Sequence, residues 1–210
     1  MGRDTSPLKL KWYTLRAGII ALVLVGSVTA ISTLFVFLGN VRSEQAAQAV
    51  SISGSQRMLS RYLGYVVADM EGATIRSRKI RNLKNSEEIL DKLISNQTKL
   101  LERDSWGALD AHRQGRIYQA YFERPINQME NFERLKAATR AVQTDIENSI
   151  TEKRNLSILA YGSFKKELES FAIGQEAVVR AYVNTANDIV DQITFLIEIT
   201  GGAMVLVLAG

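Results

Sequence analysis

The sequence predicts an all-α protein, a membrane-anchored antiparallel four-helix bundle with two transmembrane helices. Three observations predict this fold: apolar residues recur with helical periodicity, only two prolines occur in 210 residues, and an uncharged apolar run lies near each end. No segment shows the alternation of apolar and polar residues that is typical of a strand. The chain has no cysteine, which excludes disulfides and zinc–thiolate sites.

The first apolar run covers residues 17–38 and contains no charged residue. A transmembrane helix needs about 20 residues, so the run is long enough to span a bilayer. Trp12 and Tyr13 precede it, at the position where aromatic side chains favour the headgroup region. A cleaved signal peptide is the alternative, but its apolar core has only about 7–15 residues. We therefore expect an uncleaved anchor.

The segment before this run, residues 1–16, is a basic tail. Its charged residues are one acid and four bases, namely Asp4 and Arg3, Lys9, Lys11 and Arg16. The positive-inside rule then predicts a cytoplasmic N-terminus and an outer location for residues 39–192. In a bacterium this means the inner membrane and the periplasm. The charge excess is confined to the tail, which argues against a nucleic-acid-binding patch.

The second apolar run, residues 199–210, is too short for a complete span. We expect residues 193–210 to be the start of a second transmembrane helix that is incomplete here, with an output region after it. Such a region could be a kinase, a cyclase or a methyl-accepting module. A buried core helix of a soluble domain is the alternative.

Between the two runs the periodicity predicts helices almost throughout. The expected elements are a first helix from the membrane to about Arg78, a second from an N-cap at Ser86 to near Glu102, a loop over 103–117 with room for one short helix, a third helix after Pro125, and a fourth from near Asn155 into the last run. With the first and last helices entering the membrane together, these segments form an up-down-up-down bundle.

The stretch of residues 50–70 carries two separate helical faces. One face, expected to line the bundle core, contains Ile52, Leu59, Leu63, Val66 and Met70. A second, almost opposite face has spacings of four and three and contains Val50, Gly54, Arg57, Arg61, Gly64 and Ala68. Heptad spacing predicts a partner helix, and small residues allow close approach. The simplest partner is the same helix of a second subunit in a homodimer.

In such a dimer Arg57 lies close to its own copy. Two like charges repel unless an anion lies between them, and a small oxyanion can accept hydrogen bonds from both guanidinium groups. The alternative is that Arg57 and Arg61 belong to a solvated helix face.

The segment GSQRMLSRYLGY, which begins at Gly54, resembles the signature of the PilJ-type sensor domain of type IV pilus chemoreceptors. It is also similar to the corresponding segment of nitrate and nitrite sensor kinases. The resemblance implies a periplasmic four-helix sensor that dimerises through its first and last helices. It also implies an anion contact at the dimer axis by Arg57, with Gly54 beside it. In the nitrate sensors tyrosine precedes arginine after the serine, whereas Arg61 precedes Tyr62 here, which leaves the anion's identity open.

Other chemistry has little support in the sequence. His112 is the only histidine, so no His/Cys metal site can form, and no cofactor motif is present. We find no paired acids or nucleophile motif, and expect no enzyme within these residues. The sequence thus leaves two functions open: a sensor of a small anion, or a module that responds to a protein such as a pilus component.

Overall fold

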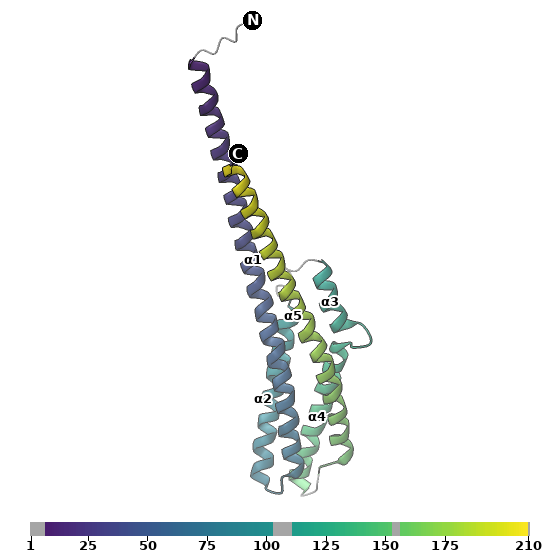
Figure 1. Ribbon diagram of the computed structural model, residues 1–210. Coiled ribbons are helices and arrows are strands. Elements are labelled where there is room, and N and C mark those ends of the chain that lie inside the picture. The colour runs from purple at the N-terminus through teal and green to yellow at the C-terminus, as the bar shows by residue number, and fades with distance from the viewer. Residues whose placement is uncertain (1–6, 103–110, 153–155, 210) are drawn as a thin grey trace. The chain divides into compact units, whose positions relative to one another are not determined.

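The structure is a computed structural model that describes residues 7–102, 111–152 and 156–209 (Figure 1). Over these ranges the chain is all-helical and contains no strand, as predicted. The five helices are α1 (Pro7–Gly72), α2 (Arg76–Leu101), α3 (Ala111–Phe122), α4 (Gln128–Glu152) and α5 (Ile158–Ala209).

The turn between α1 and α2 lies earlier than predicted. α1 ends at Gly72 and not near Arg78, because glycine favours helix termination, a signal that apolar periodicity does not register. Ser86 was predicted to cap α2 but lies inside it, ten residues after Arg76. Its hydroxyl donates to the carbonyl of Leu83 at 2.7 Å and accepts from Gln143 Nε2 of α4 at 3.0 Å. Ser86 is therefore part of the contact between α2 and α4 and does not cap the helix.

The later helices agree more closely with expectation. α3 occupies part of the predicted loop over 103–117, of which residues 103–110 lie outside the described residues. α4 begins three residues after Pro125, where the Asn127 side chain accepts a hydrogen bond from the Glu130 amide at 3.2 Å. α5 begins at Ile158, and its expected start at Asn155 also lies outside the described residues.

The chain divides into a terminal unit, residues 1–43 and 187–210, and a central unit, residues 44–186. The central unit has one hydrophobic core to which α1, α2, α4 and α5 all contribute. Each of these helices places a fully buried side chain in it: Leu63, Leu93, Leu135 and Phe171. α3 packs on α4, and Tyr121 of α3 meets Tyr182 of α5 edge to face, with ring centroids 6.5 Å apart.

The buried line of α1 differs from the predicted apolar face. Its members follow an uninterrupted heptad and are Ala46, Ala49, Ser53, Gln56, Ser60, Leu63, Val67 and Met70. Leu63, Met70 and the neighbouring Val66 are buried as predicted, whereas Ile52 and Leu59 are only half-buried. The prediction followed hydrophobicity alone, and the interior of this helix begins with small and polar side chains.

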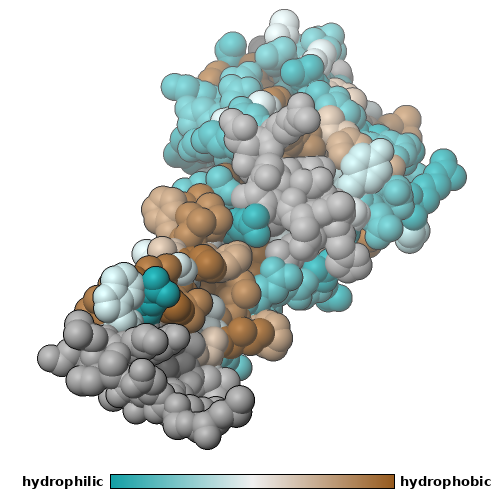
Figure 2. Space-filling view, turned by 90° about the horizontal axis from the view of Figure 1, so that it is seen from above, coloured by the Kyte–Doolittle hydropathy of each residue, from teal (hydrophilic) through white to brown (hydrophobic). Residues whose placement is uncertain are grey.

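In the terminal unit, α1 and the end of α5 pack against each other through a glycine. Gly39 is buried, and a Cβ atom placed on it would lie 2.6 Å from Cγ1 of Ile193. Among the described residues one helix, α1, is long and apolar enough to cross a membrane by length and composition. Hydrophobic residues gather on part of the surface in the space-filling view (Figure 2). The second span stays a prediction.

Candidate functional site

The guanidinium of Arg57, the residue that the sequence analysis singled out, forms an ion pair with Glu176 of α5. Arg57 Nη1 lies 2.9 Å from Glu176 Oε2, and the two side chains are 40% and 37% exposed. The other carboxylate oxygen, Glu176 Oε1, lies 3.5 Å from Nε of Arg180, one helical turn further along α5. One carboxylate is therefore held between two guanidinium groups on neighbouring helices.

This arrangement shows what kind of group the two arginines can bind. A carboxylate is a planar oxyanion, and guanidinium groups present a planar fork of donors that matches it. Because both side chains of the Arg57–Glu176 pair reach solvent, the pair contributes only about 0–1 kcal/mol to stability. The cluster carries a net positive charge, its two guanidinium groups hold one planar oxyanion, the carboxylate of Glu176, and both partners of the closer pair are in contact with solvent.

The residues of the predicted dimer face do not share one environment. Arg57 faces α5 of its own chain, and Gly64 is half-buried there, because a Cβ on Gly64 would lie 2.6 Å from Cδ2 of Leu168. Gly54, Arg61 and Ala68 are exposed, and Val50 is half-buried. Arg61 is therefore not brought to the Arg57–Glu176 pair by any described contact. Whether these residues lie at a dimer axis stays a prediction.

An exposed line on α1 overlaps the predicted face but has Met58 and Tyr65 in place of Arg57 and Gly64. Its members, spaced by four and three, are Gly54, Met58, Arg61, Tyr65 and Ala68, and we call it the open face. Met58 and Tyr65 are 65% and 68% exposed, and the adjacent Tyr62 is 49% exposed. Nothing lies within 4 Å of the position of a Cβ on Gly54. The open face thus combines two large exposed side chains, Met58 and Tyr65, with a small residue at each end.

Four buried glutamines meet in the core of the central unit, and one of them, Gln56, lies on the buried side of α1. One comes from each core helix, Gln56, Gln97, Gln128 and Gln175, and all are at most 2% exposed. We call this set the glutamine layer. The sequence analysis missed it. In the structure each glutamine continues the buried heptad of its own helix.

The glutamine layer is built from two matching halves. In the α1–α2 hairpin, Gln56 Nε2 donates to Gln97 Oε1 at 3.0 Å and to the Leu93 carbonyl at 3.3 Å. In the α4–α5 hairpin, Gln128 Nε2 donates to Gln175 Oε1 at 3.0 Å and to the Phe171 carbonyl at 3.3 Å. In both halves the two acceptors are four residues apart on the second helix.

Two further bonds join the halves. Gln175 Nε2 donates to the backbone carbonyl of Ser53 at 3.0 Å, and Gln97 Nε2 lies 3.8 Å from the sulfur of Met129. The bonds therefore run from α1 to α2, α4, α5 and back to α1. Oε1 of Gln56 and Oε1 of Gln128 are buried and accept no hydrogen bond from the described residues. If one helix slid along its axis, these buried amide hydrogen bonds would break. The layer therefore favours one axial register of the four helices.

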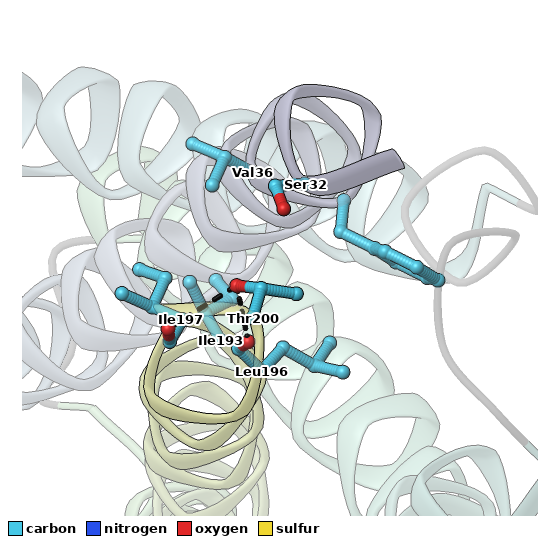
Figure 3. A pocket seen from close by; sticks show the side chains of 7 residues that line it. Ser32, Val36, Ile193, Leu196, Ile197 and Thr200 are labelled. Carbon is cyan, nitrogen blue, oxygen red and sulfur yellow. Dashed lines mark hydrogen bonds between the residues drawn. The ribbon is translucent and has the colours of Figure 1, made fainter. Parts of the chain in front are cut away.

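A small pocket of the terminal unit lies between α1 and α5 and is not a polar binding site. It is lined by Ser32, Phe35, Val36, Ile193, Leu196, Ile197 and Thr200 (Figure 3). The hydroxyl of Thr200 donates to the carbonyls of Leu196 at 2.8 Å and Ile197 at 3.2 Å, and Ser32 donates to Val28 at 2.7 Å. Both hydroxyl donors are used within their own helices, so the pocket is a gap between packed apolar helices.

Among the described residues, no cluster of His, Cys, Asp and Glu could hold a metal ion. Comparison of the chain with protein families, with curated proteins and with solved structures gives no match. The site is therefore interpreted from its own chemistry.

Proposed function

We propose that the chain is the input region of a bacterial inner-membrane receptor that senses a small anion. Residues 17–38 cross the membrane, residues 39–192 form an antiparallel four-helix sensor bundle in the periplasm, and residues 193–210 begin a second span. The apolar length of α1, the basic tail before it and the Gly39–Ile193 packing support this topology. The segment from Gly54 to Tyr65 supports a sensor role through its resemblance to chemoreceptor and nitrate-sensor signatures.

One observation carries the choice of ligand. The carboxylate of Glu176 is held by the guanidinium groups of Arg57 and Arg180, at 2.9 and 3.5 Å. Nitrate and nitrite share the planar O–X–O geometry of a carboxylate, so the donors that hold Glu176 suit them as well. The ligand we propose is a small planar oxyanion that binds Arg57, with nitrate and nitrite as the first candidates.

The receptor acts as a homodimer in this proposal, and the open face of α1 is the contact with the second copy. Met58 and Tyr65 supply apolar area, while Gly54 and Ala68 allow the two helices to approach. Arg57 lies at the edge of this face, next to the exposed Met58, where two copies can share one anion. Anion binding then shifts α1 against α5, and both helices continue into the membrane.

A second function is favoured by one specific observation, the exposure of large apolar side chains. Besides Met58 and Tyr65, Ile173 on α5 is 73% exposed. Such side chains could contact a periplasmic or pilus protein, with no small ligand. We rank this alternative second because it leaves the Arg57–Glu176–Arg180 cluster without a role.

Thermal melting of the purified chain separates the two functions. A native-state ligand stabilises by RT ln(1 + [L]/Kd), about 2.7 kcal/mol at a concentration about 100 times the Kd. We expect nitrate or nitrite to raise the melting temperature above that in chloride at equal ionic strength. If no small anion in the panel raises it, the protein-contact function becomes the better account.

A further inference from the structure

The carboxylate of Glu176 already contacts the guanidinium group that the proposed anion binds. Its Oε2 takes the Nη1 donor of Arg57, and its Oε1 faces Arg180. The three groups carry two positive charges and one negative charge. A second anion at Arg57 must therefore either replace the carboxylate or bind beside a like charge.

We infer that Glu176 is a built-in competitor for the anion site, so that its carboxylate holds Arg57 in the free protein and leaves it when a planar oxyanion binds. This inference rests on the proposed function. It adds that Glu176 sets the affinity of the site for the anion and links anion binding to the movement of α5 against α1. The exposure of both partners is what makes exchange possible, because an ion pair in contact with water separates at low cost.

The position of Glu176 connects this exchange to the helices. The preceding residue, Gln175, donates to the carbonyl of Ser53 inside the core, while Glu176 holds Arg57 outside it. Two adjacent residues of α5 thus bind two residues of α1 that are one helical turn apart. Release of Glu176 removes the outer contact and leaves the buried one. The anion therefore loosens α5 from α1 on the solvent side without breaking the core.

The test is calorimetric titration of the full chain in detergent micelles with potassium nitrate and potassium nitrite, against potassium chloride at equal ionic strength. Glu176→Gln removes the competing charge and keeps the side-chain size. Glu169→Gln is the matched control: it lies one heptad earlier on α5, is also exposed, and removes the same charge. Glu176→Ala provides a second version of the change, and Arg57→Ala removes the site.

We expect Glu176→Gln and Glu176→Ala to bind the anion about two- to fivefold more tightly than wild type, the factor that corresponds to an exposed ion pair. Glu169→Gln should stay within experimental error of wild type, and Arg57→Ala should not bind. If Glu169→Gln tightened binding as much as Glu176→Gln, the effect would come from the change in net charge alone. That result would overturn the inference.

The remaining outcomes distinguish a failure of this inference from a failure of the proposed anion-sensing function. Binding by wild type with unchanged or weaker binding by both Glu176 variants overturns the competitor role and leaves the anion site standing. Binding by the Glu176 variants alone supports competition strongly, since the carboxylate then blocks the site in wild type. No binding by any variant removes the proposed ligand and this inference together.

Discussion

The side-chain amide of Gln128 lies against the backbone of Gly174, so closely that a Cβ atom on Gly174 would be 1.9 Å from Gln128 Oε1. Gln128 cannot easily move away, because its Nε2 is held by Gln175 and by the Phe171 carbonyl. The absence of a side chain at residue 174 is therefore what lets α4 approach α5 at the glutamine layer.

The first prediction concerns this contact. Gly174→Ala should destabilise the fold by about 1–3 kcal/mol, since the new methyl group displaces a buried, hydrogen-bonded amide. Gly162→Ala on the same helix is the control: nothing lies within 4 Å of its Cβ position, and alanine should stabilise the helix by about 0.5–1 kcal/mol. Denaturant unfolding of both variants measures the difference. Equal stabilities would show that the layer is not packed as described.

The second prediction concerns acid stability. Asp69 of α1 accepts hydrogen bonds from Arg78 Nε at 3.0 Å and from Asn82 Nδ2 at 2.5 Å, both on α2. The hydrogen bond from Arg78 is the larger cause and that from Asn82 the smaller, and together they hold the pKa of Asp69 below its usual value of 3.8. A lowered folded-state pKa stabilises the fold above the unfolded-state pKa, and this contribution is lost as the pH falls through the folded-state value.

Melting temperatures of wild type and Asp69→Asn between pH 7 and pH 2 test this directly. Wild type should be the more stable at pH 7, and the gap should close as the pH falls below about 4. Arg78→Gln, which removes the partner, should behave in the same way. A gap that stays constant with pH would show that Asp69 does not titrate with folding.

The third prediction concerns topology. A reporter that is active only in the periplasm, joined after Gly115 of α3, should be active, because residues 39–192 are proposed to lie outside the membrane. A reporter that is active only in the cytoplasm should be silent at the same position. The reverse pattern would contradict the proposed orientation.

The fourth prediction concerns assembly. The chain contains no cysteine, so single cysteines can be introduced without first removing native ones. A cysteine in place of Gly54 or Ala68 should crosslink to its own copy in membranes, since both positions lie on the open face. Leu63→Cys, at a fully buried position, is the control and should not crosslink. Crosslinking at residue 63 in preference to residue 54 would place the core line at the subunit contact.

The all-α class followed from the sequence because apolar periodicity and scarce prolines are local signals. The all-helical architecture, the end of α2 and the start of α4 agree with prediction to within a few residues. The start of α2 does not, because Ser86 was taken for a cap when its hydroxyl bonds Gln143 across the core. A cap and a buried serine have the same residue type, and only the partner helix distinguishes them.

The site was predictable only in part, for a similar reason. Arg57 stands out through its motif, but its partner Glu176 is 119 positions away and carries no local mark. The glutamine layer was hidden because a hydrophobic pattern treats each glutamine as a solvated residue. Its members become interior only once four helices bring their amides together, which a single helix cannot reveal.

The most direct test of the central claim is the anion-dependent melting of Arg57 variants. For wild type, nitrate or nitrite should raise the melting temperature relative to chloride at equal ionic strength. Arg57→Ala should lose this rise entirely, and Arg57→Lys should lose most of it, because an ammonium lacks the planar fork. Arg61→Ala should retain most of it, since Arg61 has no described contact with the cluster. Equal stabilisation of wild type and Arg57→Ala by the anion would contradict the account and place the site elsewhere.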